Sequence, residues 1–229
     1  MNIRLIAVAL CVCVPAACGL PRDPEGTLER VVGGTLRVGV AENPPWVVLS
    51  GPEPSGVEVA LVERFAAELD AEIEYFEGSV EELAAAVHVG ELDLLIAGLE
   101  ATSSLSSEIA LTHPYHTTQL VIAAPENIED IAGVRVSVER GTEGAGLVEK
   151  QDAIPIQVDD ITGVDGAVAI DNFLVDDLDL VDSGVRLLET DHVMATRHGE
   201  NAFITRLERF LLEHKATLDQ VLEEMDMLR

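Results

Sequence analysis

Residues 93–115 read Asp93-Leu-Leu-Ile-Ala-Gly-Leu-Glu-Ala-Thr-Ser-Ser-Leu-Ser-Ser-Glu-Ile-Ala-Leu-Thr-His-Pro-Tyr115. The stretch opens with a short apolar run at 94–97, which suits a buried parallel strand. Gly98 ends that run where the backbone must pass close to another group, and hydroxyl residues at 102–104 can cap a short helix. A second apolar run follows at 120–124. The order predicts a strand, a polar loop, a short helix and another strand.

Regular elements are expected on both sides of this stretch. Before it, apolar periodicity predicts strands at 35–41, 72–76 and 92–97, which alternate with helices at 57–69 and 80–89. This order implies a parallel sheet with right-handed crossovers, and hence an α/β fold. After it, we expect helices at 128–133, about 142–150, 201–213 and 218–228, and strands at 134–138, 154–158, 166–170, 185–188 and 192–196.

Composition and charge restrict the class of protein. The chain has 229 residues, of which 48% are hydrophobic, and this suits one compact protein of one or two small lobes. Its 42 acidic and 14 basic residues give a formal net charge of −28. Such a surface repels nucleic acid and anionic lipid, so neither is expected as a partner.

The first residues have the pattern of an export signal. Arg4 precedes a short apolar stretch, and the small residues around Cys18 resemble a bacterial lipoprotein box, although Pro15 stands where leucine is usual. We expect a signal peptide at 1–17, followed by a lipid anchor on Cys18 and a tether at 18–34. An ordinary secretory signal is the alternative. Either interpretation predicts an exported protein, in the periplasm or at the outer face of the cell membrane.

Four short motifs occur in the order that a known family shows. They are Leu36-Arg-Val-Gly-Val40, Leu92-Asp-Leu-Leu-Ile-Ala-Gly98, Val138-Glu-Arg-Gly-Thr142 and Gly166-Ala-Val-Ala-Ile-Asp-Asn172. Together they resemble the polar amino-acid-binding family of periplasmic solute-binding proteins, which serve ABC transporters. The resemblance implies a two-lobed periplasmic binding protein type 2-like fold. Each lobe would hold a mostly parallel sheet flanked by helices, with a ligand cleft between the lobes.

The resemblance also implies lobe boundaries, partners and site residues. The first lobe would comprise residues 35–117 plus 215–229, and the second lobe 118–214. A monomer is expected, with a small solute and an ABC permease as partners and with no cofactor. The ligand-binding residues would be Asn43, Trp46, Gly98, Glu100, Thr102, Arg140, Thr142 and Asp171.

Three of these residues have a plain structural alternative. Thr142 at a helix start can cradle a ligand carboxylate, or it can simply cap its helix. Asp171 ends a strand, where open α/β sheets bind ligands, and it either takes an ammonium group or caps the next turn. Trp46 either lines the cleft or packs beneath its loop.

The departures from the family pattern point to an unusual ligand. Leu105 stands where the family has an arginine for the ligand carboxylate, and Glu100 replaces a small hydroxyl residue. The cleft therefore becomes electronegative. Glu42, Glu100 and Asp171 together suit an amine-bearing or cationic solute, with Trp46 as a possible cation–π face.

Three other functions remain open. The chain can be a scaffold or sensor lipoprotein that has lost its small ligand. A dehydratase of the cyclohexadienyl type would use Glu100 as its acid, but it would lack a clamp for an anionic substrate. A metal site at His113 and His116 would lack a third ligand at a recognised spacing. We therefore expect neither an enzyme nor a metal protein.

Overall fold

The computed structural model describes residues 22–161 and 163–215, and in them two α/β lobes share one continuous sheet. The strand order is β2-β1-β3-β9-β5-β8-β6-β7, and β4 pairs with β9 outside this path. The first lobe contains β1 (Thr35–Val40), β2 (Glu72–Glu77), β3 (Leu94–Glu100), α2 (Val57–Glu68) and α3 (Val80–Val89), with β4 (Ala110–Leu111) and the 3-10 helix η1 (Ser104–Ser107) at its edge. The second contains β6 (Arg135–Glu139), β7 (Ile154–Val158), β8 (Ala167–Asp171), α4 (Gly144–Glu149) and the 3-10 helix η2 (Asn172–Leu174).

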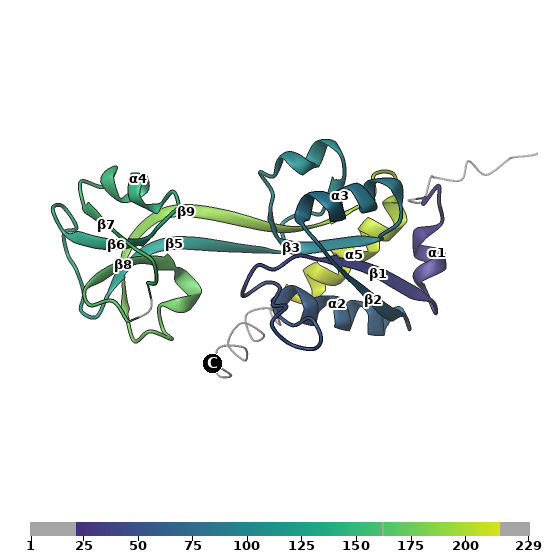
Figure 1. Ribbon diagram of the computed structural model, residues 1–229, viewed down its shortest axis with the longest axis horizontal. Coiled ribbons are helices and arrows are strands. Elements are labelled where there is room, and N and C mark those ends of the chain that lie inside the picture. The colour runs from purple at the N-terminus through teal and green to yellow at the C-terminus, as the bar shows by residue number, and fades with distance from the viewer. Residues whose placement is uncertain (1–21, 162, 216–229) are drawn as a thin grey trace, which may run out of the picture.

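A ribbon of two long antiparallel strands joins the lobes (Figure 1). These strands are β5 (His116–Ala124) and β9 (Val181–Thr196). Parallel pairs flank the ribbon in both lobes, β2-β1-β3 on one side and β8-β6-β7 on the other. The two-lobed fold with mostly parallel sheets, expected from the sequence, is confirmed.

The 16 residues of β9 form one strand, whereas the sequence analysis expected two. The polar residues 189–191, which separated the two expected strands, pair with residues 117–119 of β5. A ribbon between two lobes has faces open to solvent, so polar side chains can continue the strand there.

The helix α5 (Asn201–Glu213) packs in the first lobe, although the sequence analysis placed residues up to 214 in the second. The rings of Phe203 and Phe210 on α5 lie 6.0 and 5.3 Å from the ring of Phe65 on α2. The reason is topological: residues 193–196 of β9 pair with β3 and β4, so the chain has returned to the first lobe before α5 begins. The expected helix at 218–228 lies outside the described residues.

Part of the expected tether is folded against the first lobe. Helix α1 (Thr27–Val31) begins there, and the carboxylate of Glu200 accepts hydrogen bonds from the backbone N–H groups of Glu25 and Thr27 at 3.1 and 3.0 Å. The carboxylate of Asp23 accepts from Leu28 of α1 and from Ala202 at the start of α5. The part of the expected tether from Asp23 onward is therefore structured.

Two further local expectations were wrong. Residues 128–133 form bends and a turn instead of a helix, because the Asp130 carboxylate accepts the backbone N–H of Ala132 and Gly133 adopts a positive φ of 74°. Helix α4 is shorter than expected and begins at Gly144 instead of near Thr142.

Candidate functional site

Trp46 forms the centre of the junction between the lobes. Its side chain is buried, and its ring centroid lies 4.0 Å from that of His192 on β9 and 6.5 Å from that of Phe173, which follows β8 in the second lobe. Gly98 at the bend in β3 lies directly against the indole, since a Cβ atom there would come within 2.4 Å of Trp46 Cδ1. The backbone at Gly98 also has a positive φ of 60°, so both the conformation and the contact require glycine.

The buried carboxylate of Glu58 lies beneath this junction, and the sequence analysis missed it. Its Oε2 accepts the backbone N–H of Gly98 at 2.7 Å, and its Oε1 accepts the hydroxyl of Tyr115 at 2.7 Å. Burial raises the pKa of Glu58 to about 7, against the opposing effect of these hydrogen bonds. The available signal was a lone carboxylate between Val57 and Val59 on the apolar side of an expected helix.

A cavity of about 340 Å³ lies in the second lobe, at the carboxyl ends of β6 and β8. It is lined by Leu120, Val138, Glu139, Thr142, Glu143, Gly144, Ile161, Ala169, Ile170, Asp171, Leu174, Leu188 and Thr190. Of the described residues, no lysine or arginine lines it. The structure thus brings Thr142 and Asp171 together in an acidic pocket with apolar walls, at the sheet edge where open α/β folds bind ligands.

Asp171 is the half-buried carboxylate of this cavity. It caps no turn: among the described residues, its side chain has no hydrogen-bond or ion-pair partner. Burial raises the pKa of Asp171 to about 6. Thr142, by contrast, is occupied by its own turn, since its hydroxyl donates to the Glu139 carbonyl at 2.8 Å and accepts the backbone N–H of Gly144 at 3.3 Å.

The remaining predicted residues lie outside this cavity. The Asn43 amide donates to the Ala97 carbonyl at 2.8 Å and so braces the end of β3. Thr102 donates to Glu100 at 3.3 Å on the exposed surface of the first lobe. Glu42 accepts the backbone N–H of Leu49 at 2.6 Å.

Two positions determine whether a positive charge reaches the cavity: Arg140 and Leu105. Arg140, which the sequence analysis placed in the site, donates to Asp159 at 2.7 Å and does not line the cavity. Leu105, at the place of the family's arginine, is partly buried and packs against an apolar cluster of the first lobe. Neither therefore supplies a cation to the cavity in this structure.

The two histidines around Pro114 are held apart. The ring of His113 is hydrogen-bonded to Glu208 of α5, with Nδ1 2.7 Å from Oε1, whereas His116 lies beside Trp46 with ring centroids 5.9 Å apart. Within the described residues, no three side chains of the metal-binding types are grouped around a common point.

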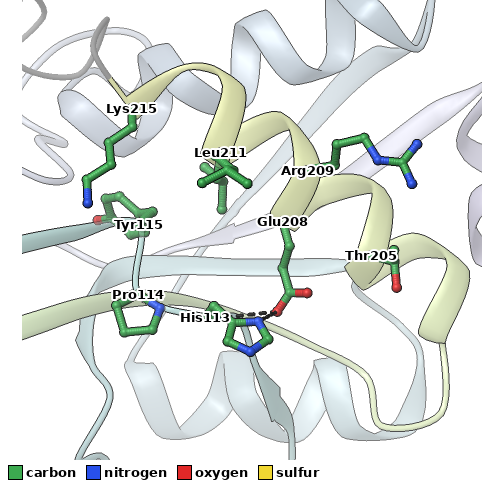
Figure 2. Close-up of a pocket in the computed structure, with 9 residues that line it drawn as sticks. His113, Pro114, Tyr115, Thr205, Glu208, Arg209, Leu211 and Lys215 are labelled. Carbon is green, nitrogen blue, oxygen red and sulfur yellow. Dashed lines mark hydrogen bonds and ion pairs between the residues drawn. The ribbon is translucent and has the colours of Figure 1, made fainter.

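A second cavity, of about 440 Å³, lies in the first lobe between α5 and the segment 113–115 (Figure 2). Its lining includes Leu211 and Lys215, and it contains none of the predicted site residues. The smaller cavity has two features of a ligand site: it lies at strand ends, and among the described residues its Asp171 carboxylate has no partner.

None of the described helices combines the length and the apolar character that crossing a bilayer requires.

A relative of known sequence matches part of this chain, and solved structures match most of it. The membrane-bound lytic murein transglycosylase F of Shewanella pealeana is 28% identical over 138 residues, which cover 57% of this chain but 29% of that protein. The L-cystine solute receptor of Neisseria gonorrhoeae, in its unliganded open conformation, has 18% identity and a TM-score of 0.72, covering 86% of this chain and 96% of that one. An ancestral cationic amino acid solute-binding protein has 19% identity and a TM-score of 0.69, covering 87% and 97%.

The structural likenesses, at these identities, concern the fold alone. The family described as bacterial extracellular solute-binding proteins, family 3, matches residues 36–224. That match covers both lobes and the ribbon between them. The chain therefore belongs to family 3 of the bacterial extracellular solute-binding proteins.

Proposed function

We propose that this protein is an exported binding protein that captures a small amine-bearing or cationic solute between its lobes for an ABC importer. The observation that carries the proposal is the Asp171 carboxylate, which is half-buried and has no partner among the described residues. A carboxylate removed from water is costly unless a positive charge or hydrogen-bond donors meet it. A ligand with an ammonium or guanidinium group supplies both.

The walls of the cavity favour the same class of ligand. Glu139 and Glu143 also line it, so the local field is negative, and the apolar side chains of Ile161 and Leu174 suit a short hydrocarbon portion. An ordinary amino acid would bring a carboxylate into this field. The described lining offers no lysine or arginine to hold that carboxylate.

The first lobe would supply the other wall when the lobes approach. Glu100 and Thr102 lie exposed at the end of β3, and Trp46 already contacts Phe173 of the second lobe. We infer that closing about this contact brings the exposed carboxylate of Glu100 toward the same cation. A cleft with an acidic residue on each wall favours a ligand with more than one positive group.

Binding of amines can be tested on the chain without its signal sequence, at fixed ionic strength. The panel would contain putrescine, agmatine, glycine betaine, arginine, glutamine and glutamate. A ligand at one hundred times its Kd should raise the free energy of unfolding by about 2.7 kcal/mol. The proposal requires a shift with the amines, and a shift with glutamate or glutamine alone would contradict it.

Asp171→Asn is the variant that assigns the site. It should weaken binding of the amines at least tenfold, because it removes the charge from the cavity. The matched control is Asp159→Asn, whose carboxylate pairs with Arg140 outside the cavity. Since burial raises the pKa of Asp171 to about 6, affinity for a permanently charged ligand should also fall as the pH drops through 6. Unchanged affinity in Asp171→Asn would exclude this carboxylate.

Export and anchoring are further parts of the proposal. The family's description as extracellular supports export, and we propose that Cys18, which lies outside the described residues, carries the lipid. Globomycin treatment with metabolic palmitate labelling tests the anchor, and Cys18→Ser should abolish the label. A labelled Cys18→Ser protein would refute it.

We propose that the protein binds its solute without transforming it. The relative named as a lytic transglycosylase is matched over less than a third of its length, so its activity is not carried over to this chain. A scaffold or sensor lipoprotein is the alternative. Absence of any shift in the ligand panel, from a folded sample, would favour it.

A further inference from the structure

Glu58 connects three segments that lie far apart in the sequence. It lies in the first turn of α2, and its two carboxylate oxygens reach the backbone of Gly98 in β3 and the hydroxyl of Tyr115. Tyr115 immediately precedes β5, one of the two strands that join the lobes. The carboxylate therefore touches both the bend that supports Trp46 and the start of the ribbon.

The surroundings of Glu58 make its two protonation states structurally different. Its side chain is fully buried, and its hydrogen bonds come from Gly98 and Tyr115, which both act as donors. The ionised carboxylate accepts both bonds. A protonated carboxyl carries a proton on one oxygen, which makes that oxygen a weaker acceptor and gives it a donor to satisfy, so one of the two bonds is weakened or turned around.

The other titratable groups at this junction are Tyr115, His116 and His192. Burial and the neighbouring Glu58 raise the pKa of Tyr115 well above its usual range, so it stays protonated. Burial, with a contribution from His116, lowers the pKa of His192 to about 4. Near neutral pH, neither Tyr115 nor His192 changes its charge.

We propose that Glu58 is a positioning residue that acts through Gly98 and Tyr115, so that its protonation sets the placement of Trp46 and the start of the ribbon between the lobes. The role is distinct from ligand contact, because Glu58 is buried beneath the junction and does not line the acidic cavity. The inference does not depend on the proposed ligand. Burial, which raises the pKa of Glu58 to about 7, makes the change occur near neutrality.

The chain provides its own reporter for this test. Trp46 is the single tryptophan of the sequence, and its indole lies against the same Gly98 whose N–H binds Glu58. Emission of the ligand-free protein, excited at a wavelength selective for tryptophan, should show a transition between pH 6 and pH 8. Circular dichroism at each pH would verify that the protein stays folded.

Three variants assign that transition. Glu58→Gln, which keeps the length of the side chain and cannot ionise, should remove it. Tyr115→Phe should move the midpoint to higher pH. The hydrogen bond from Tyr115 lowers the pKa of Glu58, so removing that bond raises it. His116→Gln should retain the transition, and it controls for quenching by the imidazole beside Trp46.

The outcomes against the proposal are equally definite. No transition in the wild type between pH 6 and pH 8 would overturn it, as would a transition that persists in Glu58→Gln or disappears only in His116→Gln. A purely structural carboxylate would alter stability in Glu58→Gln and leave the pH profile of Trp46 unchanged. If Glu58→Gln does not fold, the midpoint in Tyr115→Phe decides the question.

Discussion

Replacing Glu58 by glutamine should change how the stability of this protein depends on pH. Burial raises the pKa of Glu58 from 4.5 to about 7 in the folded state, so the folded protein holds this proton more tightly than the unfolded chain does. The associated stability is fully present below pH 4.5 and is lost as the pH rises through 7. Over the whole range this loss is worth about 3 kcal/mol, and most of it falls between pH 5 and pH 8.

Other groups near the cleft titrate in the same range, so the variant must be compared with the wild type at each pH. The pKa of His192 is lowered by burial to about 4, and its contribution has the opposite sign: stability is present above pH 6.5 and lost as the pH falls through 4. Asp171, with a pKa raised by burial to about 6, acts in the same direction as Glu58. Both contributions are common to the variant and the wild type and cancel in the difference.

The assay is urea unfolding at pH 5, 6, 7 and 8 at constant ionic strength, followed by circular dichroism. The free energy of unfolding of Glu58→Gln, relative to wild type, should rise by about 2–3 kcal/mol from pH 5 to pH 8. Glu63→Gln, an exposed residue of the same helix, is the control and should differ from wild type by less than about 0.5 kcal/mol. A relative stability of Glu58→Gln that stays constant with pH would refute the reasoning.

Two further predictions concern stability alone. Gly98→Ala should cost about 2–5 kcal/mol in urea unfolding, because it adds overlap with Trp46 to the strain of a positive φ. The control Gly133→Ala, with φ 74° and open space around the new Cβ, should cost about 1 kcal/mol, and equal costs would contradict the role of the overlap. Asp93→Asn should cost about 1–3 kcal/mol, because the buried Asp93 carboxylate binds Arg30 and Arg37. Asp159→Asn, at an exposed ion pair, should cost less than about 0.5 kcal/mol, and a loss as large as that in Asp93→Asn would contradict the importance of burial.

Local signals predicted those elements whose ends are marked by capping residues or whose buried face forms a regular stripe. Helix α3 is capped at its start by Ser79, which forms a reciprocal capping box with Glu82, and at its end by Gly90, which has a positive φ. Both signals are visible in the sequence, so the bounds 80–89 were predicted correctly. The bounds of α5 were likewise predicted, because its buried residues form one stripe along the helix.

Long-range placement could not be predicted in the same way. Periodicity identified the buried face of α5 but not the surface that covers it, so the helix was assigned to the wrong lobe. The register of β9 with β5 depends on strands that are distant in sequence. Because of this pairing, the polar residues 189–191 are part of one continuous strand and do not interrupt it. Propensity is overridden in both cases by pairing with distant strands.

In the candidate site, too, local signals predicted some residues, and long-range contacts determined the others. Thr142 and Asp171 follow strands that the sequence indicated, and the structure brings them to one cavity. The partner of Arg140, Asp159, follows the neighbouring strand β7, and only the fold shows that this pair turns the cation away from the cavity. Glu58 was missed because a carboxylate in an amphipathic helix is usually solvated, and its burial depends on Gly98 and Tyr115, which are remote in sequence.

The folded start of the first lobe limits how far the protein could move from a membrane. Asp23 is bound to both α1 and α5, so with the lipid on Cys18 that we propose, four residues, and hence five Cα–Cα steps, separate the anchor from the folded lobe. Fully extended, they reach at most about 17 Å. A body held this close would search for its importer by lateral diffusion in the plane of the bilayer, with its first lobe nearest the lipid and its second lobe free to sample the solution.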